Sequence, residues 1–265
     1  MRFSFLQKIL HYLPYYLKAR TRYDLHSPFI FEFDTRVLPD KKDCGECREI
    51  ESLRNALKKD DRVIEAQDFG AGKGNDCPSA RVRKISEIIQ NAAVNPKYGR
   101  LLFRIAGWLK PRNILELGTS AGIGTLYLAL GNKSAMVITI EGSEAVASLA
   151  NDNFSRLKVK NIHLITGNFD LVLPDLMKNN PVFDLVYIDG NHKYEATLRY
   201  YHLLKSYVNN EGLIIFDDIH WSEGMERAWS EIRSYPEITA SVDLFQFGLV
   251  FFNKRLTKQH FILRY

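Results

Sequence analysis

The sequence predicts an α/β fold with a mostly parallel sheet and helices on both of its faces. From Pro96 onward, short apolar runs alternate with longer segments of helical periodicity. This alternation is typical of right-handed strand–helix–strand crossovers, which build parallel sheets. Residues 1–95 show mostly helical patterns and polar loops instead. We therefore expect a mainly helical extension or lid at 1–95 and an α/β domain at 96–265.

The elements expected in the α/β domain follow one another in regular alternation. Helices are expected at about 97–109, 122–130, 143–156, 172–179, 192–208 and 223–234. Strands are expected at 114–117, 136–140, 162–166, 184–188 and 212–216. The last two apolar runs, 242–247 and 248–252, lie too close together for a helical crossover, which indicates an antiparallel strand at the end.

The first residues form an apolar pattern at helical spacing, carried by Phe3, Leu6, Ile9, Leu10 and Leu13. Pro14 and a basic stretch, 18–22, follow it. Packing against the core is the ordinary outcome for such a helix. The alternative is a helix on a membrane surface, because Lys8 and the basic stretch suit anionic lipid. The aromatic segment that follows, 26–31, either forms part of a lid or docks the extension.

Composition favours a globular protein of 265 residues, of which 46% are hydrophobic. No apolar run approaches the ~18 residues that span a bilayer, and the first residues lack a secretory layout. We therefore expect no transmembrane segment and a cytoplasmic location. The net charge of +5 is scattered, which favours a solvated surface and leaves RNA as a less favoured partner. The sequence leaves open whether the protein forms a homo-oligomer.

Three cysteines argue against a disulfide framework and are typical of a reducing compartment. Cys44 and Cys47 form a C-x-x-C pattern without a second pair. A zinc site would need Cys77 and a histidine such as His26 from elsewhere in the chain. The prediction is two free thiols in a loop.

A glycine-rich segment at 68–74 has only a weak apolar lead, and Lys73 is not followed by Ser or Thr as in a phosphate loop. We interpret Gly70–Gly74 as a flexible loop that leads into a helix at about Arg81–Asn91. Whether this loop folds over a ligand stays open.

A second glycine-rich segment is more informative, because it directly follows the buried strand at 114–117. Gly118, Gly122 and Gly124 let the backbone approach a ligand closely. The spacing E-x-G-x-x-x-G-x-G differs from the dinucleotide fingerprint G-x-G-x-x-G. Glu116 would repel a pyrophosphate but suits a cationic group such as an α-amino group. The alternative is a structural turn that binds nothing.

The next strand ends in Glu141, whose carboxylate has two acceptor oxygens for the two hydroxyls of a ribose. Glu141 follows Gly118 at close to the ~20-residue offset of a ribose-binding acid. Asn168 and Phe169 follow the third strand, at the same edge of the predicted sheet.

The segment from Glu116 to Gly124 closely resembles motif I of the class I S-adenosylmethionine-dependent methyltransferases. The resemblance covers roughly residues 96–253 and implies a Rossmann-like, seven-stranded sheet. It implies cofactor binding by Glu116, Gly118, Thr119, Ser120, Gly122, Glu141, Asn168, Phe169 and Asp189. Asn168 stands where the family often has an acid that contacts adenine, although an amide oxygen can also accept a hydrogen bond from the base.

Two later strands end in carboxylates, Asp189 after one and Asp217 with Asp218 after the other. Such oxygen ligands suit Mg²⁺, which would relieve their mutual repulsion. The pattern is similar to metal-dependent O-methyltransferases of catechols and of sugar or macrolide hydroxyls. Asp218 in place of the Asn of the catechol type brings it nearer the sugar-modifying relatives. The alternative is that Asp217 and Asp218 cap the next helix.

His192 stands three residues after Asp189, where the resembling families place a general base. An imidazole titrates near neutrality and can take the acceptor proton. His220 is a reserve candidate for this role and Lys193 a weaker one. A capping or surface role for His192 is the alternative.

These observations predict an S-adenosylmethionine-dependent O-methyltransferase, assisted by Mg²⁺, that acts on a hydroxyl of a small molecule or a sugar. His192 and Asp189 are the candidate catalytic residues. An RNA methyltransferase and a non-catalytic nucleoside-binding protein are the alternatives.

Overall fold

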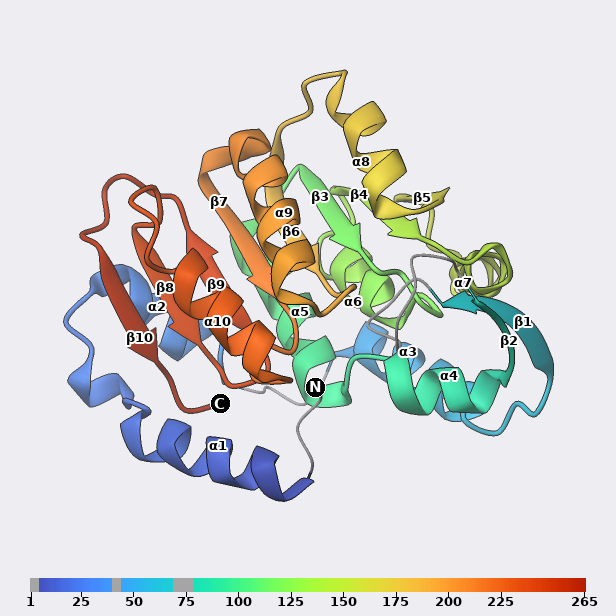
Figure 1. Cartoon of the computed structure of the whole chain (residues 1–265), viewed down its shortest axis with the longest axis horizontal. Coiled ribbons are helices and arrows are strands. Elements are labelled where there is room, and N and C mark those ends of the chain that lie inside the picture. The colour runs from blue at the N-terminus through green and yellow to red at the C-terminus, as the bar shows by residue number, and fades with distance from the viewer. Residues whose placement is uncertain (1–4, 40–43, 69–78) are drawn as a thin grey trace. The chain divides into compact units, whose positions relative to one another are not determined.

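The computed structural model describes residues 5–39, 44–68 and 79–265 (Figure 1). Their contacts group the chain into two compact units. The continuous unit is Asp40–Pro181, and the discontinuous unit joins Met1–Pro39 to Val182–Tyr265.

Three parallel strands form the sheet of the continuous unit, in the order β3 (Asn113–Leu117), β4 (Met136–Glu141) and β5 (Ile162–Thr166). Leu117 pairs with Ile140, and Glu141 pairs with Thr166. The carboxyl ends of all three strands therefore lie at one edge. The helices of this unit are α3 (Gly45–Leu57), α4 (Ile85–Ala92), α5 (Pro96–Leu109), α6 (Ile123–Gly131), α7 (Glu144–Arg156) and α8 (Phe169–Met177).

Local signals set the start of α5, which leads into β3. The Asn95 side chain accepts a hydrogen bond from the Tyr98 amide at 3.1 Å, and Pro96 occupies the first helical position. Proline has no amide hydrogen, and none is needed at this position, because no carbonyl of the helix is placed to accept it. The helix ends where Lys110 adopts a left-handed conformation. This agrees with the helix predicted at 97–109.

Five strands form the sheet of the discontinuous unit. Their order is β10 (Gln259–Ile262), β8 (Ala240–Asp243), β9 (Gly248–Phe251), β7 (Val208–Phe216) and β6 (Phe183–Ile188). β6 is parallel to β7 and β10 is parallel to β8, while β9 runs antiparallel to both β7 and β8. The helices are α1 (Phe5–Lys18), α2 (Pro28–Arg36), α9 (Tyr194–Leu204) and α10 (Glu223–Ile232), with short 3-10 turns η1 (Arg22–Asp24) and η2 (Lys205–Tyr207).

The α/β fold class with mostly parallel strands is confirmed, and so is the antiparallel strand near the end. Among the described residues, the mostly parallel sheet has eight strands, where the sequence predicted seven. The additional strand is β10. Its first two residues, Gln259 and His260, are exposed, and Phe261 is buried. One buried side chain in so short a strand is too weak a hydrophobic pattern to predict it.

A two-stranded antiparallel ribbon, β1 (Val63–Asp68) with β2 (Ser79–Lys84), was not predicted either. Val63 and Val82 are exposed, so the ribbon buries no regular apolar face. It is held to the start of α7 by a 3.1 Å hydrogen bond from the Gln67 amide to Ser143 Oγ.

The helix expected from Arg81 begins only at Ile85, because Arg81 and its neighbours pair in the ribbon. The Gly70–Gly74 segment lies outside the described residues, so its role stays a prediction.

The aromatic segment at 26–31 forms the start of α2 and docks it onto the sheet. Ser27 caps the helix by accepting a hydrogen bond from the Ile30 amide, and Pro28 is its first residue. The rings of Phe29 and Phe33 pack edge-on against Phe251 of β9. This segment is therefore a docking element of the discontinuous unit.

The prediction of two free thiols in a loop is wrong, because Cys44 and Cys47 form a disulfide. Cys44 is the N-cap of α3, and its sulfur accepts a hydrogen bond from the Cys47 amide at 3.0 Å. The first helical turn brings the two Cα atoms to 5.2 Å, which is within the range that a disulfide spans. The paired sulfurs are not available as zinc thiolates, and Cys77 lies outside the described residues.

No helix in the described ranges is long and apolar enough to cross a bilayer. The cytoplasmic location stays a prediction.

We expect the disulfide to hide two of the three cysteines from a thiol reagent. Protein purified without reductant and denatured in guanidinium should release one equivalent of thiol in a colorimetric assay with a disulfide reagent. The same protein should release three equivalents after reduction and desalting. A Cys47→Ser variant should release two equivalents in both states. Three equivalents from unreduced wild-type protein would contradict the pairing.

Candidate active site

A tight glycine turn joins β3 to α6 in the continuous unit. Gly118, Ser120 and Gly122 all have positive φ angles, of 102°, 49° and 81°. A Cβ atom on Gly122 would lie 2.4 Å from the ring of Phe154, so both the backbone angle and the close packing require glycine there. The turn therefore brings bare backbone to the carboxyl edge of the strands, as predicted.

Glu116 lies buried beneath this turn, with 1% of its surface exposed. One carboxylate oxygen, Oε2, accepts hydrogen bonds from the hydroxyls of Thr125 and Thr139. The other, Oε1, is buried and has no hydrogen-bond partner among the described residues. Burial raises the pKa of Glu116 to about 7, although the two threonine hydroxyls oppose this shift. An amino group of a ligand would satisfy Oε1 and stabilise the charged form.

Glu141, at the end of β4, binds the turn directly. Its Oε2 accepts a hydrogen bond from the Ser120 amide at 2.8 Å, and its Oε1 accepts one from the Ser143 amide at 3.0 Å. Burial raises the pKa of Glu141, and these backbone hydrogen bonds oppose the increase. Each oxygen can accept a second hydrogen bond, which is what two ribose hydroxyls would supply.

Thr119 links the turn to β4 by a 2.6 Å hydrogen bond between its hydroxyl and that of Thr139. Neither Thr125 nor Thr139 was predicted as part of the site. The parallel register could have indicated Thr139, since it pairs directly with Glu116 on the neighbouring strand.

Asn168 and Phe169 follow β5 at the same edge of the sheet. Asn168 is the N-cap of α8, where its Oδ1 accepts a hydrogen bond from the Asp170 amide at 2.9 Å. This cap starts the helix at Phe169, three residues before the predicted start. The Asn168 carboxamide nitrogen is a donor, so an adenine contact by this residue would use that atom or the second lone pair of Oδ1.

Asp189 and Asp217 form a second group of polar residues, in the discontinuous unit. The Tyr187 hydroxyl lies 2.7 Å from Asp217 Oδ2 and 3.0 Å from Asp189 Oδ2. One hydroxyl hydrogen is thus shared between two carboxylates. Tyr187 was not predicted as part of the site, although its position two residues before Asp189 on a buried strand was a signal.

Asp217 is almost fully buried, and its other oxygen accepts hydrogen bonds from the Asp218 amide at 2.7 Å and from Gln246 Nε2 at 3.0 Å. Burial raises the pKa of Asp217 well above its usual value, and the charges of Asp189 and Asp218 raise it further. This repulsion is relieved when the group binds a proton or a cation. No group of three or more His, Cys, Asp or Glu side chains within the described ranges is arranged to hold a metal ion.

His192 lies beside these carboxylates. Its Nε2 is 3.7 Å from Asp189 Oδ1, and its ring lies 5.9 Å from the ring of Trp221. Burial lowers the pKa of His192, and the charge of Asp218 opposes this. The imidazole is therefore neutral near pH 7 and can accept a proton.

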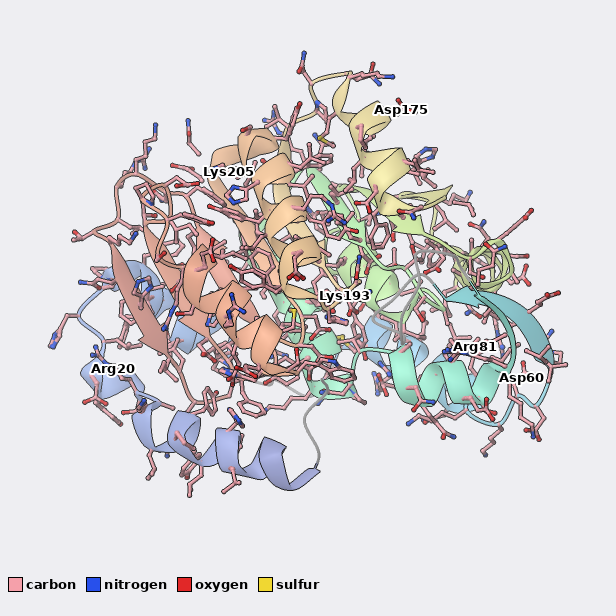
Figure 2. The ribbon with its side chains drawn as sticks, viewed as in Figure 1. Arg20, Asp60, Arg81, Asp175, Lys193 and Lys205 are labelled. Carbon is pink, nitrogen blue, oxygen red and sulfur yellow. A yellow bond between two sulfur atoms is a disulfide. The ribbon has the colours of Figure 1, made fainter. Side chains whose placement is uncertain are left out.

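His220 is held differently from His192. Burial alone would lower its pKa, but hydrogen bonds to Asp243 (3.0 Å) and Glu226 (2.8 Å) raise it to about 9. Both ring nitrogens donate in the charged form, so His220 cannot accept a proton near neutrality. Lys193 is exposed at the start of α9, where Figure 2 labels it.

The structure contradicts the alternative that these residues cap the helices that follow them. Ser222 caps α10 by accepting a hydrogen bond from the Met225 amide, so Asp217 and Asp218 do not. The N-cap of α9 is Lys193, so His192 is not a cap either.

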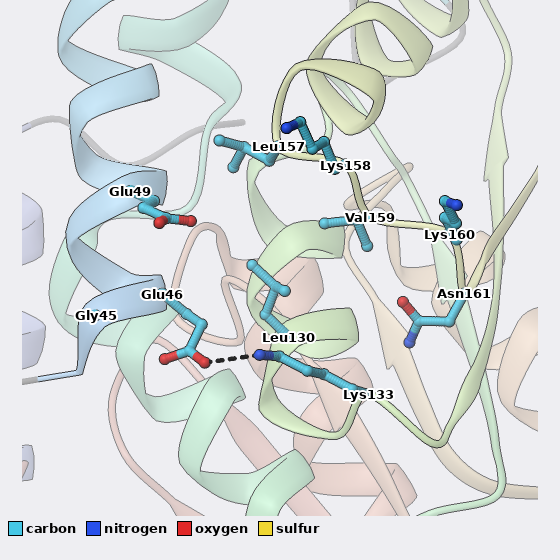
Figure 3. A pocket seen from close by; sticks show the side chains of 10 residues that line it. All are labelled: Gly45, Glu46, Glu49, Leu130, Lys133, Leu157, Lys158, Val159, Lys160 and Asn161. Carbon is cyan, nitrogen blue, oxygen red and sulfur yellow. Dashed lines mark hydrogen bonds and ion pairs between the residues drawn. The ribbon is translucent and has the colours of Figure 1, made fainter.

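A cavity of about 570 Å³ in the continuous unit is separate from these residues (Figure 3). It lies at the amino ends of β4 and β5, beside Lys133 and Asn161, whereas the glycine turn lies at their carboxyl ends. A 2.9 Å hydrogen bond joins Lys133 to Glu46 at its rim. The cavity is therefore not the predicted cofactor site.

Comparison with known protein families matches residues 115–219 to a family described as a methyltransferase domain. This range begins in β3 and includes the glycine turn, Glu141, Asp189, His192 and both aspartates after β7. Residues 115–219 are therefore similar to a methyltransferase domain.

Two curated relatives have O-methyltransferase names. The domain is 32% identical over 102 residues to a catechol O-methyltransferase of Niastella koreensis, covering 37% of this chain and 46% of that protein. It is 31% identical over 160 residues to the O-methyltransferase hkm8 of Aspergillus hancockii, covering 58% and 61% of the two chains. The chain thus spans about half the length of the curated relatives it matches.

Among solved structures, an O-methyltransferase of Bacillus cereus in complex with SAH has a similar fold. It aligns with a TM-score of 0.55 at 20% identity, over 79% of this chain and 91% of that one. At this identity the likeness shows the fold alone.

We expect the buried Glu116 to make stability depend on pH. Its folded-state pKa of about 7 lies above the ordinary value of 4.5 for a glutamate, so folding disfavours the ionised form. The stability that it contributes is full below about pH 4.5 and decreases as the pH rises through 7. Glu116→Gln mimics the neutral acid, so its stability relative to wild type should increase by about 1–3 kcal/mol between pH 5 and pH 7.5. Urea unfolding of both proteins at the two pH values measures this, and a difference independent of pH would contradict it.

Proposed function

We propose that this protein is an S-adenosylmethionine-dependent O-methyltransferase that acts on a hydroxyl of a small molecule or a sugar. The observation that carries the proposal is a pair of carboxylates at a glycine turn, the buried Glu116 and the partly buried Glu141. A cofactor with a pyrophosphate would be repelled there. S-adenosylmethionine has an ammonium group and a ribose but no phosphate, so it suits this turn.

In this proposal each part of the cofactor has a partner of matching chemistry. The ammonium group pairs with Glu116, whose buried Oε1 has no donor among the described residues, and the atoms that cover this oxygen would have to move for direct contact. The ribose hydroxyls donate to Glu141. Backbone at Gly118, Thr119 and Ser120 approaches the cofactor closely, while Asn168 and Phe169 contact the adenine.

Methyl transfer needs the sulfonium, the methyl carbon and the acceptor oxygen in line and near contact distance. The acceptor oxygen must also lose its proton. His192 takes this proton as the general base, and its lowered pKa supports the role because the ring is neutral near pH 7. Asp189, 3.7 Å from His192, then stabilises the imidazolium that forms.

The proposal includes assistance by Mg²⁺, because the side chains at this site are of the kind that bind this ion. Asp189, Asp217 and Asp218 supply hard oxygen ligands, and burial together with their mutual repulsion raises the pKa of Asp217. A bound Mg²⁺ would acidify an acceptor hydroxyl. Asp217 would first have to exchange hydrogen bonds from Tyr187 and Gln246 for the ion, since both engage its carboxylate.

Two substitutions should separate cofactor binding from turnover. His192→Ala should bind S-adenosylmethionine as wild type does but lose about 10²–10⁴-fold in kcat, because a general base contributes that much. Glu141→Gln should weaken binding in calorimetry by about tenfold, which corresponds to roughly 1.4 kcal/mol. His163→Ala, at an exposed histidine on β5, is the matched control. Undiminished turnover in His192→Ala would remove this residue from the mechanism.

We expect transfer of label from tritiated S-adenosylmethionine into a cell extract to be resistant to RNase and sensitive to EDTA. Added Mg²⁺ should restore the EDTA-treated reaction, because the aspartates would then regain the ion that acidifies the acceptor. Label sensitive to RNase would instead identify an RNA methyltransferase. Transfer unaffected by EDTA would contradict magnesium assistance. Cofactor binding without any transfer would indicate a non-catalytic nucleoside-binding protein.

A further inference from the structure

Three leucines on α1 are exposed along one side of the helix. Leu10, Leu13 and Leu17 have 68%, 56% and 75% of their surface exposed. Their spacing of three and four residues places them one above another on a single face. Scattered exposed leucines are ordinary, but a row of three on one helix is a continuous apolar stripe.

The other side of α1 is fixed to the discontinuous unit. Tyr15 is buried, its hydroxyl donates to the Leu263 carbonyl at 2.6 Å, and its ring packs against Phe245. The backbone of Arg20, just after the helix, pairs with Leu263 beyond β10. These contacts hold the helix at both its middle and its end, so the leucines are on its outward side.

Two tyrosines lie beside the leucine stripe. Tyr12 and Tyr16 are 41% and 40% exposed. The Tyr12 ring also packs edge-on against Phe245 at 4.9 Å, and the Arg264 guanidinium lies 4.2 Å from the centre of the Tyr16 ring. Tyrosine is enriched at the boundary between lipid and water, because its ring is apolar and its hydroxyl is polar.

The charged residues among the first 22 positions of the sequence have a single sign. The first 22 residues contain five Lys and Arg residues, namely Arg2, Lys8, Lys18, Arg20 and Arg22, and no Asp or Glu. Lys18 and Arg20 are exposed, and Figure 2 shows Arg20 beside the end of α1. The net charge of the whole chain is also +5.

We propose that α1 binds an anionic phospholipid surface, lying in the plane of the membrane with its leucine stripe inserted. The helix has 14 residues, which is too short to span a bilayer. The charged residues of this segment are all cationic, although Glu226 pairs with His11 of the same helix. An apolar stripe with cationic residues beside it is the pattern of an interfacial helix. A second copy of the chain is less favoured as the occupant, because it would bring two cationic flanks together.

Co-sedimentation with large vesicles tests the proposal on the full chain. Wild-type protein should bind vesicles of phosphatidylglycerol and phosphatidylcholine, and should bind pure phosphatidylcholine at least tenfold more weakly. A Leu13→Asp/Leu17→Asp variant should lose at least tenfold in affinity for the anionic vesicles. Its melting temperature should stay unchanged, because both leucines are exposed.

The matched control is Leu171→Asp, at a leucine on α8 that is 73% exposed and far along the chain from α1. This variant should bind the vesicles as wild type does. Equal binding by the double variant, or no binding by wild type, would overturn the proposal. It would also be overturned by a wild-type dimer in light scattering that the double variant dissociates. None of these outcomes bears on the methyl-transfer proposal, which concerns other residues.

Discussion

The geometry of the glycine turn depends on one buried carboxylate, that of Glu116. Through Thr139 and Thr125, Glu116 joins β3 to β4 and to α6, the helix that follows the turn. Burying a carboxylate is costly unless its oxygens are hydrogen-bonded, and here one oxygen is. The two threonines thus hold the strand end and the helix start at a fixed separation, and Glu141 holds the loop between them through the Ser120 amide. The turn is therefore shaped before any ligand binds, at the expense of one unsatisfied oxygen.

The second polar group follows a different physical logic. Asp189, Asp217 and Asp218 are like charges brought together by neighbouring parallel strands, with Tyr187 between two of them. Together with burial, the resulting repulsion raises the pKa of Asp217. His192 and His220 differ for a related reason: His220 has a carboxylate on each ring nitrogen and is held as a cation, while burial keeps His192 neutral. Two histidines at the same sheet edge thus differ in charge near pH 7, because His220 is a cation and His192 is neutral.

Most of the elements that sequence alone could predict carry an apolar run or a clear cap. β3 to β7 were predicted to within a few residues because each contains such a run, although β5 has no fully buried residue, and α5 was predicted because Asn95 and Pro96 mark its start. β10 and the β1–β2 ribbon have little buried surface and left no such pattern. Glu116 and Glu141 were predicted from spacing, but their partners Thr125 and Thr139 required the register of neighbouring elements. The Cys44–Cys47 disulfide depended on where α3 begins, which composition does not reveal.

The division of the chain into units has a consequence for how the protein forms during synthesis. The continuous unit, Asp40–Pro181, is complete as soon as its own residues have been made. The discontinuous unit is not, because Tyr15 waits for Leu263, a partner 248 residues later. Domains fold from the N-terminus as the ribosome proceeds, so α1 remains undocked for most of translation. During that interval its buried tyrosine face and its leucine stripe are both accessible, and a chaperone or a nearby membrane could engage the nascent chain before its own sheet does.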